Sequence, residues 1–506
     1  MLLNRKSVEL LAPAGTWDAL VAGVESGADA VYLGGKHFNM RMHEGEFNFD
    51  DALLKKAIDY AHEHGVRLYI TLNNLISNEE IPALREYLAY LNEIRPDALL
   101  VQDFAVLELV HEMGITIPLH TSVMMNTHNE HAIEKLKEYG ITRIVVGREM
   151  TLSELSLFRE RTGIEVEYFM HGDMCISESG QCIHSGVLFG QSGNRGRCLK
   201  PCRWAYKLID EKTGEVLDKD GPGAYKLALK DMCMYRAIPQ LIQAGVFSFK
   251  IEGRMRPAGF IRRIVSTYRK AIDAYIADPN GYTTDEEGWK TLYDNRARDF
   301  TTTFAFGQPG KKDIGFTGER EPRFFSHAVK EAGFQDEVLR QERDIEKENA
   351  AHRTLSVRVN TMESAKAAID NGADTIYVGG EAFRPLRPWK LGDYEEILAY
   401  AKGKARVVVT TPRTTMRREC GELEQFFTAL REIRPDGLMV SNLGSLKLAQ
   451  SITDLPVQAD LSFNLFNQLA AKFLQENGLS MAAISYELSF EQLREIVETA
   501  ELPLET

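Results

Sequence analysis

Short apolar runs rich in β-branched residues alternate with helix-like stretches along the first third of the chain. Seven of these runs have the length and composition of buried strands. They cover residues 8–11, 30–33, 67–72, 98–101, 117–120, 143–146 and 165–169. Regular strand–helix alternation predicts parallel strands joined by right-handed crossovers. An eighth run at 246–251 follows an insertion at about 172–245, so we predict an α/β fold whose N-terminal part, residues 1–280, is a (β/α)8 TIM-like barrel.

The chain then repeats part of this pattern. Residues 24–35, VESGADAVYLGG, return as IDNGADTIYVGG at 369–380, and the EIRPD of 93–97 returns at 432–436. Internal repetition predicts a second barrel-like βα repeat over residues 355–506, incomplete because the pattern stops inside its seventh strand. We expect a partner chain, or self-association through the second repeat, to cover the open strand edge.

The two copies differ in their chemistry. The second copy has no cysteine cluster and carries Gln458 at the position of His120, so we interpret it as a scaffold or binding unit. Residues 281–354 are polar and charged, and we expect them to form a connector with a helix near 338–352.

Composition limits the partners and the location of the protein. The 506 residues are 44% hydrophobic and 26% charged, with a formal net charge of -13. This charge argues against nonspecific polyanion binding by the molecule as a whole. Since no apolar run reaches the roughly 18 residues of a membrane span and no apolar signal region begins the chain, we expect a cytoplasmic protein without a membrane partner.

Two local stretches are basic despite the negative total. Residues 195–207 carry Arg195 and Arg203 among five basic residues and no acid, interleaved with aromatic residues such as Trp204. Residues 250–270 carry seven basic residues against one acid. Basic residues beside aromatic ones suit contacts with RNA phosphates and stacking on bases. The alternative is a solvated helix face in one stretch and charge that shields a metal cluster in the other.

Four of the six cysteines lie close together and follow the seventh predicted strand. Cys175, Cys182, Cys198 and Cys202 have the spacing C-x6-C-x15-C-x3-C, which places them on the C-terminal face, where barrel enzymes have their active sites. Disulfides are disfavoured because they belong to oxidising compartments. Zinc is the second alternative, although zinc sites usually show two CxxC-like pairs. An iron–sulfur cluster, which needs thiolates converging from glycine-rich loops, is the favoured interpretation.

Polar residues at the ends of the predicted strands indicate a pocket under the cysteines. His120 and His171 are candidates for moving protons, with Glu149 or Glu252 orienting them. Candidate substrate contacts have amide or guanidinium groups: Arg41, Asn73, Asn126, Arg148 and Arg254 on the rim, and Arg195 and Arg203 in the basic stretch; Gln102 is a further polar residue of the rim. Each of these could instead be a satisfied rim or core group, and Lys250 and Glu252 could instead form an ion pair inside the barrel.

Protease motifs are missing from the sequence. It contains neither HExxH nor GxSxG. His62, His64, His128 and His131 lack the i, i+4 spacing of a metalloprotease helix, and we predict that they are exposed helix residues.

Three motifs carry a resemblance to a known family. They are EYFMHGDMCISESGQC at 167–182, NRGRCLKPCR at 194–203 and KIEGR at 250–254. Together with LLAPAG at 10–15 and GADAVY at 27–32, they make the first 310 residues or so similar to the collagenase-like peptidase family U32.

The resemblance implies a function and a cofactor. Better-understood relatives in this family are iron–sulfur proteins that hydroxylate RNA bases or ubiquinone precursors without molecular oxygen, in a pathway that depends on prephenate. Carried over to this chain, the ligands of a 4Fe-4S cluster fall on Cys175, Cys182 and Cys198, with Cys202 as the fourth ligand and Cys233 as its rival. The expected function is oxygen-independent hydroxylation of a nucleobase in tRNA or rRNA, with prephenate as a candidate oxygen donor. A collagenase-like endopeptidase and a noncatalytic iron–sulfur partner subunit stay open as alternatives.

Overall fold

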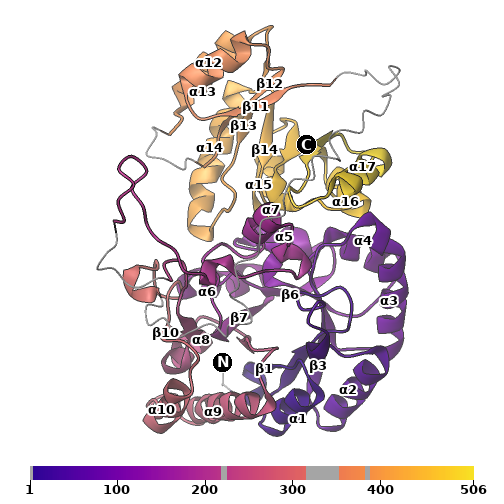
Figure 1. Ribbon diagram of the computed structural model, residues 1–506, viewed down its shortest axis with the longest axis vertical. Helices are drawn as coiled ribbons and strands as arrows, with labels where there is room; N and C mark the ends of the chain where they lie inside the picture. The colour runs from indigo at the N-terminus through magenta and orange to yellow at the C-terminus, as the bar shows by residue number, and fades with distance from the viewer. Residues whose placement is uncertain (1–3, 218–224, 315–352, 382–387) are drawn as a thin grey trace. The chain divides into compact units, whose positions relative to one another are not determined.

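The computed structural model describes residues 4–217, 225–314, 353–381 and 388–506, and the chain forms two compact units, Met1–Val329 and Lys330–Thr506. Each unit contains one largely parallel sheet with helices packed along its outer face (Figure 1). Among the described helices, none combines the length and the apolar character needed to cross a membrane.

Unit 1 contains the predicted (β/α)8 barrel. Its eight strands are β1 (Glu9–Pro13), β2 (Ala30–Leu33), β3 (Arg67–Leu72), β4 (Ala98–Val101), β5 (Leu119–Thr121), β6 (Ile141–Val145), β7 (Glu165–Gly172) and β9 (Ser248–Ile251). Neighbouring strands are parallel, and β9 closes the barrel by pairing with both β1 and β7. The outer helices are α1 (Trp17–Glu25), α2 (Asp51–Glu63), α3 (Ile81–Ile94), α4 (Phe104–Glu112), α5 (Glu130–Lys137), α6 (Leu152–Thr162), α8 (Ile238–Gln243) and α9 (Ala258–Ala277). The predicted fold class is confirmed.

Capping residues and apolar faces explain these helices locally. Thr16 caps α1 by accepting a hydrogen bond from the Ala19 N–H, and Asp103 caps α4 in the same way. Helix α2 buries Leu54 and Ile58 on one face, at the spacing expected of an amphipathic helix.

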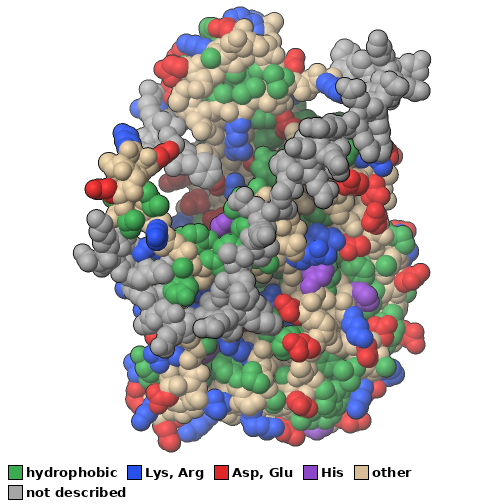
Figure 2. Space-filling view, in the orientation of Figure 1, with side chains coloured by type: hydrophobic (Ala, Val, Ile, Leu, Met, Phe, Trp, Pro, Cys, Tyr) green, Lys and Arg blue, Asp and Glu red, His purple; other side chains and the backbone are tan. Residues whose placement is uncertain are grey.

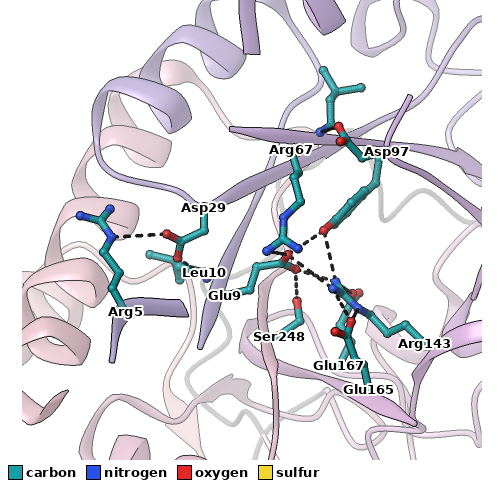
Figure 3. Close-up of polar contacts among 12 residues, drawn as sticks. Arg5, Glu9, Leu10, Asp29, Arg67, Asp97, Arg143, Glu165, Glu167 and Ser248 are labelled. Atoms are coloured by element: carbon teal, nitrogen blue, oxygen red, sulfur yellow. Dashed lines mark hydrogen bonds and ion pairs between the residues drawn. The ribbon is translucent and has the colours of Figure 1, made fainter. Parts of the chain in front are cut away.

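The N-terminal end of the barrel interior is charged and fully buried. Glu9 accepts hydrogen bonds from the Tyr69 hydroxyl at 2.6 Å and the Ser248 hydroxyl at 2.7 Å, and Arg143 Nη1 lies 2.6 Å from Glu9 Oε1 (Figure 3). Burial alone would raise the pKa of Glu9, but Arg143 and Arg67 hold that pKa below its ordinary value. This network therefore fills the N-terminal end of the barrel interior. The candidate functional site lies at the C-terminal end.

A second buried ion pair inside the barrel joins β9 to β7. Lys250 Nζ donates to Glu167 Oε1 at 2.6 Å, and both side chains are almost fully enclosed. The alternative of a Lys250–Glu252 ion pair inside the barrel is therefore wrong in its partner: Lys250 pairs with Glu167, whereas Glu252 lies 3.7 Å from Arg41.

Additional elements extend the barrel sheet beyond its eight strands. The end of β7 pairs antiparallel with β8 (Asp231–Cys233), and β10 (Phe300–Thr301) pairs with β8 in parallel. Helix α10 (Glu286–Asp294) precedes β10, and Leu292 on this helix is buried.

This extension differs from the connector that we expected over 281–354. Its described part, residues 281–314, packs on the barrel, and the Leu152 N–H bonds the Ala305 carbonyl at 3.0 Å. The buried Arg298 lies 2.7 Å from Asp173 and 2.6 Å from Asp231. The polar sequence concealed this packing because long-range ion pairs help to hold the segment, together with only a few buried apolar side chains such as Leu292 and Ala305. The helix expected near 338–352 lies outside the described residues.

Unit 2 is the second, incomplete repeat. Seven parallel strands follow in chain order: β11 (Ser356–Val359), β12 (Thr375–Gly379), β13 (Arg406–Thr410), β14 (Gly437–Val440), β15 (Val457–Ala459), β16 (Leu479–Ala483) and β17 (Leu504–Glu505). The helices are α12 (Met362–Asp370), α13 (Leu391–Ala401), α14 (Cys420–Ile433), α15 (Leu443–Ile452), α16 (Gln468–Glu476) and α17 (Phe490–Thr499). Tyr377, Val408 and Met439 pack inside the curled sheet, which the described strands leave open.

Candidate functional site

The residues between β7 and β8, described over 173–217 and 225–230, form a cysteine-rich segment that covers the C-terminal end of the barrel. Its short helix α7 (His184–Phe189) follows Cys182. The carbonyl of Asn194 accepts from the Leu75 N–H at 2.9 Å, and Arg195 Nη1 bonds Glu80 at 2.8 Å. These contacts fix the segment to the loop that follows β3.

The segment is also in close contact with two other loops of the barrel. A Cβ added at Gly180 would overlap the backbone of Met124, which follows β5, and one at Gly196 would meet the backbone of Asn39 and Met40, which follow β2. Gly180 and Gly196 both have positive φ, so glycine is needed there for conformation as well as for space.

The four clustered thiols are electrostatic neighbours. Desolvation, followed by Cys175, raises the pKa of the Cys202 thiol to about 12, and Cys198 and Cys182 add to the shift while Arg203 opposes it. Cys175 Sγ also lies 3.9 Å from Arg148 Nη1. The structure therefore brings together the four residues that we expected as ligands.

Cys233, the rival fourth ligand, is buried in β8 with its sulfur 3.5 Å from the Tyr268 hydroxyl, and burial raises its pKa to about 11.

The donor set fits an iron–sulfur cluster in kind. Four thiolates are the usual ligands of such a cluster. As the described side chains lie, no group of three or more His, Cys, Asp or Glu is close enough together to enclose one metal ion. The four thiols thus lie in one segment and influence one another electrostatically, and their assembly around iron and sulfide stays a prediction.

Several predicted substrate contacts are engaged inside the protein. Arg254 is buried and donates to Asn39 at 3.0 Å and to Asn48 at 3.0 Å. Arg203 is buried too, and its guanidinium bonds the carbonyls of Met174 and Leu229. These arginines hold the loops around the site, which differs from the substrate role that we predicted for them.

Arg195 has the same internal role through its two bonds to Glu80, at 2.8 and 2.9 Å. Arg195 and Arg203 of the basic stretch 195–207 are therefore engaged in bonds within the protein. On the face seen in Figure 2, acidic and basic side chains are interspersed over unit 1.

Arg41, Arg148 and Asn73 remain on the rim. Arg41 lies 3.7 Å from Glu252, and the Arg148 guanidinium stacks over the Phe169 ring at 4.0 Å. Asn73 Nδ2 donates to the Ser122 hydroxyl at 3.2 Å and so joins the ends of β3 and β5.

Below this rim are buried polar atoms without partners. Both amide atoms of Gln102 and of Asn126, and Nδ1 of His120, have no hydrogen-bond partner among the described residues. Leaving such a group unpaired costs about 1–3 kcal/mol, so a set of them at the active face of a barrel indicates a place for a polar ligand or water. Gln102 directly follows β4, between the strands that Asn73 and Ser122 join.

Neither predicted proton carrier is charged. Burial, with Arg143 and Lys250, holds the pKa of His120 well below its ordinary value, and its ring packs edge-on against Tyr69 at 5.0 Å. Burial, with Arg256, lowers the pKa of His171 to about 3. Both are neutral imidazoles at physiological pH.

Glu149 pairs with a histidine that we predicted to be exposed. His128 Nε2 lies 2.6 Å from Glu149 Oε1, and both side chains are buried, whereas His62 and His64 are exposed as predicted. Burial opposes charge on both groups, but Glu149 raises the pKa of His128 and His128 lowers that of Glu149. The error arose because His128 precedes the cap of α5 and faces inward.

Glu149 also binds the cysteine-rich segment. It accepts from the Ser179 N–H at 3.3 Å and from the Ser179 hydroxyl at 3.4 Å. Since Ser179 bonds the carboxylate rather than the imidazole of His128, the three side chains do not form a hydrolase triad. The pair holds the loop between Cys175 and Cys182 in place.

The protein is thus a TIM-barrel protein of the cysteine-rich class, with a closed (β/α)8 barrel and a four-cysteine segment over its C-terminal end. A family model for peptidase family U32 matches residues 15–315 and 360–506, and the chain belongs to that family.

Curated relatives carry two kinds of name. The chain is 32% identical over 376 residues to tRNA hydroxylation protein P1 of Bacillus subtilis, covering 73% of this chain and 86% of that protein. It is 34% identical over 280 residues to the 23S rRNA 5-hydroxycytidine synthase of Escherichia coli, covering 55% of this chain and 41% of that protein. It is 30% identical over 296 residues to a collagenase of Porphyromonas gingivalis, covering 56% and 69%.

Proposed function

We propose that this protein is an iron–sulfur-dependent enzyme that hydroxylates a nucleobase in tRNA or rRNA without molecular oxygen. The observation that carries the proposal is the set of four adjacent thiols above the buried, unpartnered amides of the barrel. The names of the relatives from B. subtilis and E. coli support the reaction class. A cytoplasmic location belongs to the same proposal.

Cys175, Cys182, Cys198 and Cys202 would hold the cluster, which would supply electron transfer or bind the oxygen-donating molecule. Hydroxylation replaces C–H by C–OH, which is a two-electron oxidation of the base. Without O2, a donor must supply the oxygen atom and itself be reduced by those two electrons, and prephenate is our candidate for that donor. Arg148 and Arg41 lie on the rim where they would bind a carboxylate of such a donor. The Gln102 amide offers one donor and one acceptor, which suits the edge of a nucleobase.

The test begins with protein purified without oxygen. Iron, acid-labile sulfide and zinc are measured with the visible spectrum in wild type, Cys202→Ala and Cys233→Ala. About four irons and four sulfides per chain, lost in Cys202→Ala and kept in Cys233→Ala, are expected. Stoichiometric zinc without sulfide would overturn the cluster and favour the zinc alternative.

The second step examines the product. Nucleosides from tRNA and rRNA of cells with and without the gene are compared by mass spectrometry, with Cys202→Ala as the inactive control. A hydroxylated pyrimidine that disappears with the gene and returns only with wild type is expected. Unchanged RNA in a strain whose protein carries the cluster would contradict the RNA substrate.

A collagenase-like endopeptidase is the second candidate, favoured by the name of the P. gingivalis relative. Cleavage of denatured collagen by anaerobically purified protein, lost on mutation of the site, would support it. A noncatalytic subunit is the third, and it would be supported if light scattering showed self-association or a bound partner through unit 2.

A further inference from the structure

Arg148 is a rim cation of unit 1 that forms no ion pair with a carboxylate of the described residues. It follows β6 and is half-buried, and its guanidinium stacks over the Phe169 ring at 4.0 Å. The side chain that it meets with a polar contact is a thiol, since Nη1 lies 3.9 Å from Cys175 Sγ. Charged groups withdrawn from water are usually paired, and a cysteine that binds a metal provides such a charge as a thiolate.

The second repeat has a different residue at this position. Tyr486 is the third residue after β16, as Arg148 is the third residue after β6, and the tyrosine side chain is exposed. The glutamate that follows is present in both copies, as Glu149 and Glu487. Because the second copy also lacks the cysteine cluster, the arginine occurs together with the clustered thiols, whereas the glutamate occurs without them.

Another of the four thiols accepts a hydrogen bond from the backbone. The Lys200 amide nitrogen lies 3.3 Å from Cys198 Sγ. Lys200 has the left-handed conformation, with a φ of +53°, which residues other than glycine rarely adopt. The chain reverses at this residue with the N–H toward Cys198, and Lys200 Nζ lies 3.4 Å from Asp173. Backbone strain is often stored at functional sites, and here it accompanies a donor to a sulfur.

Neighbouring residues fix both donors. A Cβ added at Gly147 would overlap the carboxylate of Glu149, so the turn that carries the arginine is tightly packed. The Leu199 N–H bonds the Ser185 hydroxyl at 3.0 Å and ties the turn at Lys200 to α7. Packed elements of the fold therefore hold both donors beside the sulfurs.

Donors directed at sulfur have a defined effect on an iron–sulfur cluster. The thiolate ligands give such a cluster negative charge, and reduction adds to that charge. A guanidinium or an N–H at a ligand sulfur stabilises the added charge, so it raises the reduction potential. Arg148 has several N–H donors, so its bond to Cys175 leaves others for the carboxylate of an oxygen donor.

We propose that Arg148, through Cys175, and the Lys200 N–H, through Cys198, raise the reduction potential of the cluster that these thiols would hold. Both act through a ligand, so neither is a catalytic residue in this role. The inference rests on the proposed function for the presence of the cluster, and it adds which residues set the potential. The step concerned is the gain of one electron from an external reductant, with no bond made or broken.

The test is a redox titration of anaerobically purified wild type and variants with dithionite, followed by visible absorption, with iron and sulfide measured in each protein. Arg148→Gln should lower the reduced fraction at a fixed potential about tenfold, which equals a shift of about 59 mV for one electron. Arg148→Lys should shift the potential less, because it keeps the charge without the planar fork. Arg262→Gln is the control, since Arg262 is exposed and bonds Glu25 at 2.8 Å, and it should leave the potential unchanged.

Lys200 is tested by a matched pair of variants, Lys200→Gly and Lys200→Val. Both lose the ammonium group, but only valine opposes the left-handed conformation. The potential should therefore be lower in Lys200→Val than in Lys200→Gly.

The outcomes separate this inference from the proposed function. A wild-type potential in both Arg148 variants, or equal potentials in the Lys200 pair, would overturn the role of that residue; if Arg148→Gln loses its iron, Arg148→Lys decides. Wild type without iron and sulfide would overturn this inference together with the proposed function. A shifted potential in protein that modifies no RNA would support this inference and contradict the RNA substrate, and an unshifted one in protein that modifies RNA would overturn this inference alone.

Discussion

The ion pair between Lys250 and Glu167 allows a quantitative test of how the barrel is held together. Lys250 Nζ lies 2.6 Å from Glu167 Oε1, and the side chains are 5% and 0% exposed. Lys250→Met removes the cation and leaves a buried carboxylate with only a 3.4 Å contact to Arg143. Breaking one side of such a pair costs about 3–5 kcal/mol, so Lys250→Met should destabilise unit 1 by that amount.

Hydrogen exchange on β7 and β9 is the suitable assay, because a chain with two units need not unfold in one step. The expected loss corresponds to roughly 100- to 5000-fold faster exchange at slow amides such as Tyr168 and Phe249, which are paired in the sheet. Lys270→Met is the control, since Lys270 forms an exposed pair with Asp285 and its loss should change nothing measurable.

A double variant separates the lost pair from other effects. Lys250→Met with Glu167→Gln removes both charges and should recover part of the stability, since no unpaired carboxylate remains. Exchange of Lys250→Met at the wild-type rate would refute the reasoning, and so would a double variant whose loss equals the sum of the single losses.

Three further predictions concern the site. The raised pKa of His128 and the lowered pKa of Glu149 mean that their pair stabilises the cysteine-rich segment fully between pH about 4.5 and 6.5, and that this contribution is lost as the pH rises through the folded pKa of His128. Protease protection of the segment should therefore fall as the pH rises above about 6.5 in wild type and stay flat there in His128→Asn. Gln102→Leu removes an unpartnered buried amide. Thermal unfolding should therefore show stability unchanged or raised by about 1 kcal/mol, while the proposed RNA hydroxylation is lost. A destabilised variant would mean that the amide has an internal role. Arg195→Ala breaks the two bonds to Glu80 and should cost about 1–3 kcal/mol of local stability, seen as faster exchange in the segment without change in β1; unchanged exchange would contradict the anchoring role.

The arrangement of strands was accessible from the sequence because it depends on local patterns. The runs at 30–33, 67–72 and 98–101 coincide with strands β2, β3 and β4, and the run at 246–251 closes the barrel as β9. The repeat GAD-x-x-Y, with Tyr32 and Tyr377 in equivalent strands, correctly predicted a second unit. Alternation and repetition are properties of neighbouring residues, so they need no knowledge of distant contacts.

The partners of polar residues were harder to predict, because they depend on residues far away in the chain. The buried His128 pairs with Glu149, and the buried Arg298 pairs with Asp173 and Asp231. Arg203 and Arg254 look like free basic residues in sequence, yet each is used to hold backbone or amide groups of other loops. The grouping of the four cysteines as ligands of one cluster stays a prediction.

The extension over 281–314 has a consequence for how such barrels can be divided or recombined. Arg298 lies between Asp173, at the end of β7, and Asp231, at the beginning of β8, so it neutralises two carboxylates that belong to the barrel side of the molecule. A fragment cut where the eighth strand and its helix end would leave those acids facing each other and would remove Phe300 from His171. The structural module is therefore the barrel with its extension, and exchange between family members should keep residues 1–314 together.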